Sequence, residues 1–254
     1  MTVSIENKLG ISQRIDSYTL INLSELIKNI LEDISIQVKL SDEENTQLST
    51  SETAVLNVLK FYHEEIDLSS ELANDINYEE IIQSVYKELK KIIFHHRLSS
   101  ELLTLDYWHI AFVLWRIHHG GLIHFLEMIV SSITELANQT DNLEDLLDIL
   151  EIINELTLAV VPEYYDDMSD SDPSRPWRVL LINYAIVATR TYDINEIEAA
   201  YKFLVSHLPE DAAQFFKEAM LQMVVQNYPQ DVRDVVENFY QQYTVNQEYL
   251  KHVH

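Results

Sequence analysis

Residues 23–38 read LSELIKNILEDISIQV, and their apolar side chains recur at steps of three and four residues. The positions that follow this spacing are Leu23, Leu26, Ile27, Ile30, Leu31, Ile34 and Val38. Such steps place side chains on one face of an α-helix, whereas a half-buried strand alternates with a period of two. The stretch therefore predicts an amphipathic helix that buries one face in a core.

The same periodicity predicts further helices along the chain. They are expected at about 78–93, 105–118, 121–137, 142–161, 176–190 and 194–207. Ser49 and Glu52 match the capping-box pattern, so we expect another helix to begin after them. Asp193 provides a similar start signal for the helix at 194–207. Pro209 and Pro229 precede acidic residues, which predicts two more helices with proline in the first position.

Glycine and proline are distributed as an all-α protein requires. The chain of 254 residues has three glycines, at 10, 120 and 121, and all five prolines follow residue 161. Sheet proteins need many tight turns for which glycine is the usual residue. We therefore predict an all-α fold, either a multi-helix bundle or a short irregular α-solenoid, with roughly ten helices. The adjacent glycines are expected to end one helix and lead into the next.

A change of composition after residue 161 predicts the domain organisation. Residues 162–176 are acidic, are bounded by prolines and read as a loop. We expect an N-terminal helical region at 1–161 and a C-terminal helical region at 177–254, packed as two domains or as one. The loop between them is a candidate functional segment.

Charge and cysteine content exclude several classes of protein. Lys and Arg number 17 against 42 Asp and Glu, which gives a net charge of −25, and there is no cysteine. Such a charge repels phosphates, so nucleic acid is not expected as a direct ligand. Disulfides, zinc–thiolate sites and cysteine nucleophiles are excluded. Without a signal-peptide pattern or an apolar run of about 18 residues, we predict no membrane segment and a cytoplasmic location.

The acidic residues are concentrated in one part of the chain. Residues 117–174 contain no Lys or Arg, and they contain 13 acidic residues. On the predicted helix at 142–161, four acids at steps of four, three and four lie opposite an apolar face that includes Leu143, Leu147 and Leu150. With the acids of the loop they form the predicted partner-binding surface. Its residues are Glu144, Asp148, Glu151, Glu155, Asp166, Asp167, Asp170 and Asp172.

A histidine-rich stretch offers candidates for metal ligands. Asp106 with His109, and His124 with Glu127, each have the i,i+3 spacing that places two side chains on one helix face. Helical di-iron proteins use this spacing, but with paired Glu-x-x-His motifs that this chain lacks. Histidines at helix ends that bond backbone carbonyls are the alternative. Whether a metal binds stays open, and no cofactor is predicted.

Together these features favour a non-catalytic function. We predict an acidic helical protein that binds a basic surface on a protein partner. The most specific form of this prediction is an inhibitor that mimics nucleic acid. One alternative is a helical metal- or cofactor-dependent enzyme that uses the histidine-rich centre. Another is a helical scaffold whose acidic face is merely solvated. The sequence does not define the partner or the oligomeric state.

Overall fold

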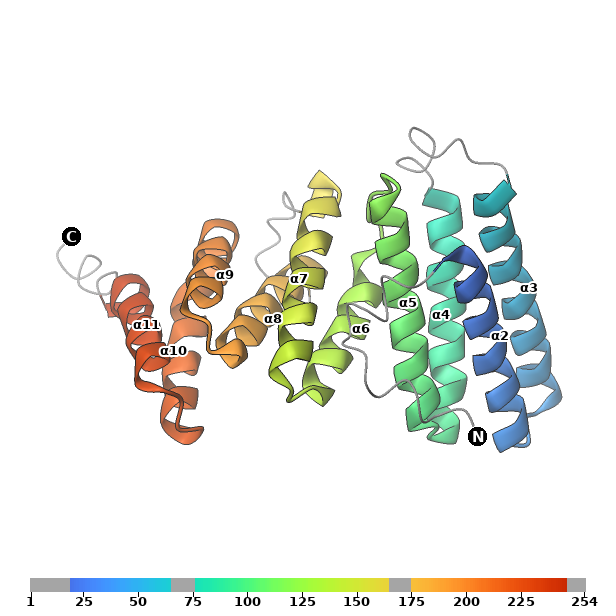
Figure 1. The fold of residues 1–254 in the computed structure, drawn as a ribbon, viewed down its shortest axis with the longest axis horizontal. Coiled ribbons are helices and arrows are strands. Elements are labelled where there is room, and N and C mark those ends of the chain that lie inside the picture. The colour runs from blue at the N-terminus through green and yellow to red at the C-terminus, as the bar shows by residue number, and fades with distance from the viewer. Residues whose placement is uncertain (1–18, 65–75, 165–174, 246–254) are drawn as a thin grey trace. The chain divides into compact units, whose positions relative to one another are not determined.

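The chain folds as helices throughout the part that the structure describes. The structure is a computed structural model that describes residues 19–64, 76–164 and 175–245. Within these ranges it has ten α-helices, α2 to α11, and a single isolated β-bridge in place of any sheet (Figure 1). The predicted all-α class and the approximate number of helices are confirmed. Among the described residues, no helix has both the length and the apolar character needed to cross a membrane.

The chain divides into two compact units. The first comprises Met1–Asp141 with Glu151–Tyr164, and the second comprises Asn142–Leu150 with Tyr165–His254. Most of the predicted boundary loop, residues 165–174, lies outside the described residues. The division into regions at 1–161 and 177–254 therefore stays a prediction.

Helices of the first unit surround an aliphatic and aromatic core. Its helices are α2 (Leu20–Gln37), α3 (Asp42–Glu64), α4 (Ile76–His96), α5 (Ser99–His118), α6 (Leu126–Gln139) and the second half of α7 (Leu143–Ala159). In Figure 1, α2 to α5 stand side by side, with α2 packed on α3 and α5, and α4 packed on α3, α5 and α6. Leu23, Ile27 and Ile34 of α2 are fully buried, as their spacing predicts. The indole nitrogen of Trp108 in α5 donates to the Leu23 carbonyl at 3.0 Å.

The start of α3 corrects one sequence prediction. The helix begins at Asp42, well before the pattern at Ser49 and Glu52, which lies inside it. Ser41 and Glu44 form the actual capping box: the Glu44 amide donates to Ser41 Oγ at 3.2 Å, and the Ser41 amide donates to Glu44 Oε2 at 2.8 Å. Three acids in the first turn also favour this start, because they lie at the positive end of the helix dipole.

The two glycines end α5 as predicted, but α6 begins later than predicted. Gly120 has a φ of 86°, and the Gly121 amide donates to the Arg116 carbonyl at 2.8 Å. A Cβ at Gly121 would lie 2.9 Å from that carbonyl oxygen. Residues 122–125 then run outside any helix, since the Ile123 amide donates to the carbonyl of Ala159, the last residue of α7, at 2.9 Å, and the Ile123 carbonyl accepts from the Val161 amide at 3.1 Å. These backbone bonds delay the start of α6 from about residue 121 to Leu126.

The second unit is a smaller helical array. Its elements are the first half of α7, α8 (Pro176–Thr191), α9 (Ile194–His207), α10 (Pro209–Val225), α11 (Gln230–Tyr240) and the π-helical turn η4 (Gln241–Val245). A short 3₁₀ helix, η3 (Pro162–Tyr164), belongs to the first unit. Asp193 caps α9 by accepting from two backbone amides, as predicted. Pro209 is in the first turn of α10, whereas Pro229 precedes α11 at its N-cap.

Candidate functional site

The predicted acidic stripe lies on α7, and its four members differ in exposure. Glu144 and Glu151 are exposed, whereas Asp148 and Glu155 are half-buried. The Glu155 carboxylate lies 2.7 Å from His118 Nε2, so this member of the stripe has a histidine partner. Asp166, Asp167, Asp170 and Asp172 lie outside the described residues. The acidic face that solvent can reach on α7 is therefore centred on Glu144 and Glu151.

The apolar face of α7 is narrower than predicted. Leu143 and Leu147 were expected in the buried face with Leu146, Leu150, Ile153 and Leu156, but they are 49% and 39% exposed. Leu158 is also exposed, at 78%. At 100° per residue, Leu147 and Leu158 lie on the same side of the helix as Glu151. The exposed face of α7 thus combines carboxylates with leucines.

Asp106 and His109 of the predicted metal pairs belong to a buried network of hydrogen bonds. Both side chains are 0% exposed. The Tyr86 hydroxyl donates to Asp106 Oδ1, and Ser132 Oγ donates to the Tyr86 hydroxyl at 2.9 Å. His109 Nδ1 lies 3.1 Å from Ser132 Oγ. These bonds link α4, α5 and α6 in the core of the first unit.

His124 and Glu127, the other predicted pair, lie apart from that network. His124 Nδ1 is 3.0 Å from Glu79 Oε2, and Glu127 is exposed. Among the described residues, Asp106, His109, His124 and Glu127 form no group of three ligand atoms close enough to hold one ion. Asp106 and His109 share one turn of α5, as their spacing predicts, whereas His124 lies in the non-helical segment before α6, so the predicted helical pairing of His124 with Glu127 is wrong.

Burial determines the protonation of the network. It raises the pKa of Asp106 and of Tyr86, and the nearby Asp106 carboxylate raises the pKa of Tyr86 further. Burial, with a smaller effect of the Lys90 charge, lowers the pKa of His109 to about 3. His109 is therefore neutral at physiological pH. Because Gln83 Nε2, 3.1 Å from His109 Nε2, can only donate, the ring proton is on Nδ1 and points to Ser132.

His109 is expected to make the protein less stable in mild acid. An unfolded histidine takes up a proton near pH 6.5, whereas folded His109 does so only near pH 3. The contribution of His109 to the free energy of unfolding is thus fully present above the pKa of the unfolded state. It falls as the pH decreases below that value, by about 2 kcal/mol at pH 5. Urea unfolding of wild type and His109→Gln at pH 7 and pH 5 tests this. Between pH 7 and pH 5 the free energy of unfolding should fall by about 2 kcal/mol more in wild type than in the variant, because only wild type retains the imidazole of His109. Equal losses in both proteins would contradict the assignment.

A second buried cluster is centred on the ion pair between Glu79 in α4 and Arg116 in α5. Glu79 Oε2 lies 3.0 Å from Arg116 Nη1, and both side chains are 2% exposed. Glu79 Oε1 accepts from the backbone amides of His124 and Phe125 at 3.0 Å and 3.1 Å. One carboxylate thus neutralises a buried guanidinium and holds the segment that precedes α6. Sequence reasoning missed Glu79, because nothing local distinguishes it from the exposed Glu80 beside it.

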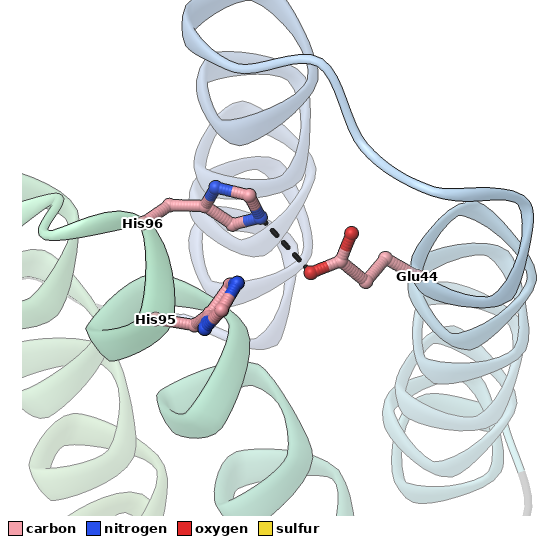
Figure 2. Close-up of side chains that lie close together, drawn as sticks. All are labelled: Glu44, His95 and His96. Atoms are coloured by element: carbon pink, nitrogen blue, oxygen red, sulfur yellow. Dashed lines mark hydrogen bonds and ion pairs between the residues drawn. The ribbon is translucent and has the colours of Figure 1, made fainter.

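A group of side chains with metal-ligand chemistry lies where α3 begins and α4 ends. Glu44, His95 and His96 each offer one ligand atom, and these atoms all lie within 4.8 Å of one another. Figure 2 shows His96 and Glu44 pointing toward each other, with His96 Nε2 2.9 Å from Glu44 Oε1. Sequence reasoning missed this group, because Glu44 is more than 50 positions away from the two histidines. The local sequence feature that marks Glu44 is its capping box with Ser41.

Comparison of the chain with protein-family models, with curated proteins and with solved structures gave no match. The functional argument therefore depends on the residues and geometry of this chain.

Proposed function

We propose that this chain is a non-catalytic interaction protein that binds a basic surface of a protein partner through the acidic face of α7. The observation that carries the proposal is the exposure of Glu144 and Glu151 within a segment of 58 residues that has no Lys or Arg. Neighbouring positions of the stripe lie about 5–6 Å apart, and its two exposed members, Glu144 and Glu151, lie about 10 Å apart along the helix. A basic surface that binds closely spaced phosphates would meet a similar row of charges here.

The energetics of the helix support this proposal over a merely solvated face. Like charges four residues apart destabilise a helix by about 0.2–0.5 kcal/mol per pair, whereas Glu–Lys pairs stabilise it. The chain uses such pairs elsewhere: Lys202 Nζ lies 2.7 Å from Glu198 Oε2 on α9. On α7 no lysine separates the acids. A cationic partner would relieve this repulsion, and the field of the acidic face would accelerate its approach.

The burial of His109 argues against the alternative of a metal- or cofactor-dependent enzyme that uses the histidine-rich centre. Asp106 and His109 are inaccessible to solvent, so a substrate has no direct contact with either side chain. Both take part in hydrogen bonds that link three helices. Their arrangement is what a structural polar network in a helical core requires.

Binding to a fluorescently labelled arginine-rich peptide tests the proposal. Anisotropy at low ionic strength should show saturable binding, because guanidinium groups pair with closely spaced carboxylates. A glutamate-rich peptide of equal length is the control and should not bind. Double-stranded DNA added as a competitor should displace the chain from the arginine-rich peptide, because its phosphates bind the same guanidinium groups. Failure of the arginine-rich peptide to bind would overturn the proposal.

A further inference from the structure

Glu44, His95 and His96 lie at an end of the first unit where α2 and α4 end and α3 and α5 begin. The loop after α2 leads into α3, and α4 is joined to α5 by only two residues, Arg97 and Leu98. In Figure 1 the last turns of α2 and α4 and the first turns of α3 and α5 lie at the same end of these helices. The side-chain amide of Gln37 in α2 donates to Glu101 in α5 across this end.

The backbone holds both histidines at the last turn of α4. Arg97 has a φ of 59°, and the Leu98 amide donates to the Ile93 carbonyl at 3.0 Å. This is the bonding of a Schellman motif, which ends a helix sharply. The imidazole rings of His95 and His96 lie edge to face, with centroids 4.9 Å apart. The end of the helix therefore presents two adjacent nitrogen ligands to the start of α3.

The Glu44 carboxylate is oriented by hydrogen bonds on its other oxygen. Oε2 accepts from the Ser41 amide at 2.8 Å and from Ser41 Oγ at 2.9 Å, which leaves Oε1 directed at His96. These Ser41 bonds, with the His96 contact, lower the pKa of Glu44 to about 2. Hydrogen bonds that fix a ligating carboxylate in this way recur around metal ions in proteins.

We propose that Glu44, His95 and His96 bind a divalent transition metal ion of the Zn²⁺ type. Two imidazoles and one carboxylate are ligands that Zn²⁺ prefers, and three protein ligands leave a fourth position for water. Ligand atoms about 2.0–2.1 Å from a tetrahedral ion are about 3.3 Å apart. The 2.9 Å between His96 Nε2 and Glu44 Oε1 is close to that separation. His95 is exposed, so an ion can enter from solvent.

The alternative is that Glu44 and His96 simply form an ion pair between α3 and α4. Such a pair would not require His95, whereas a three-ligand site does. The proposal therefore predicts that a residue outside the ion pair controls metal affinity. It does not depend on the function proposed for α7.

Zinc titration of the chelator-treated full chain tests the proposal. Equilibrium dialysis with Zn²⁺, followed by metal analysis, should show one site that is tighter than the background from other histidines. His95→Ala should weaken that site by at least about tenfold, the range over which even outer-shell partners affect metal affinity. Glu44→Gln should do the same while the capping box is kept, because glutamine also serves there. His63→Ala, which removes another exposed histidine from α3, should leave the affinity unchanged.

Two further measurements separate loss of a ligand from loss of structure. Circular dichroism should show that His95→Ala stays helical without metal. Saturating Zn²⁺ should raise the thermal midpoint of wild type and of His63→Ala but not of His95→Ala, since only an intact site stabilises the folded state. Equal Zn²⁺ affinity in wild type and both ligand variants would overturn the proposal, as would the absence of a site above background.

Discussion

Replacing Glu79 by alanine is expected to lower the free energy of unfolding of the protein by about 3–5 kcal/mol. Removal of one member of a buried ion pair leaves the other charge without compensation, and such changes have effects of this size. Arg116 is 2% exposed, and its Nε and Nη2 have no partner among the described residues, so Glu79 is its principal compensation. Two backbone amides before α6 would also lose their acceptor. Urea unfolding followed by circular dichroism measures the change.

Glu80→Ala is the matched control for this measurement. Glu80 occupies the next position of α4 but is exposed. Its removal should change stability by no more than about 0.5 kcal/mol. The double variant Glu79→Leu with Arg116→Met should recover part of the loss, because it removes both buried charges together, although the two backbone amides still lack their acceptor. Equal effects of Glu79→Ala and Glu80→Ala would contradict the role assigned to the ion pair.

The helices were predictable from sequence because their signals are local. Apolar spacing identified most of the buried positions of α2, although Leu26 is only half-buried, and Asp193 identified the start of α9. The start of α3 was misplaced because Ser41 with Glu44 and Ser49 with Glu52 satisfy the same pattern. Local sequence does not determine which of two such patterns the chain uses. The start of α6 was misplaced because backbone bonds to the end of α7 and to Val161 beyond it hold residues 122–125 out of the helix.

The candidate sites were less predictable, because they depend on contacts between helices. The i,i+3 spacing of Asp106 and His109 correctly places both on one face of α5, but that face is directed into the core. Glu79 and Arg116 are distant in sequence and meet only when α4 packs on α5. Glu44 reaches the two histidines for the same kind of reason. A list of charged residues cannot distinguish such positions from solvated ones.

Charge reversal on α7 is expected to have the second large effect. Glu144→Lys with Glu151→Lys places two cations on the face proposed to meet the arginine-rich peptide. Each cation then opposes a cation of the partner, so binding should weaken by roughly tenfold or more. The helix itself should be as stable as before or more so, since repulsion within the stripe decreases. Fluorescence anisotropy measures the affinity, and circular dichroism checks the fold.

Glu25→Lys with Glu32→Lys is the matched control for charge reversal. These residues are exposed on α2 and have the same separation of seven positions. Both double variants change the net charge equally, so a general attraction between an acidic chain and a basic peptide would weaken equally in both. A larger loss in the α7 variant would localise the binding surface to that helix. Equal losses would contradict the localisation.

The association rate of the arginine-rich peptide as a function of salt tests the central claim most directly. At physiological ionic strength the Debye length falls to ~8 Å, so attraction between exposed charges is largely screened. Stopped-flow measurements should show that the rate for wild type and for the α2 control falls steeply with added salt. The rate for the α7 variant should be lower and depend much less on salt. A rate that is indifferent both to salt and to charge reversal on α7 would contradict the account.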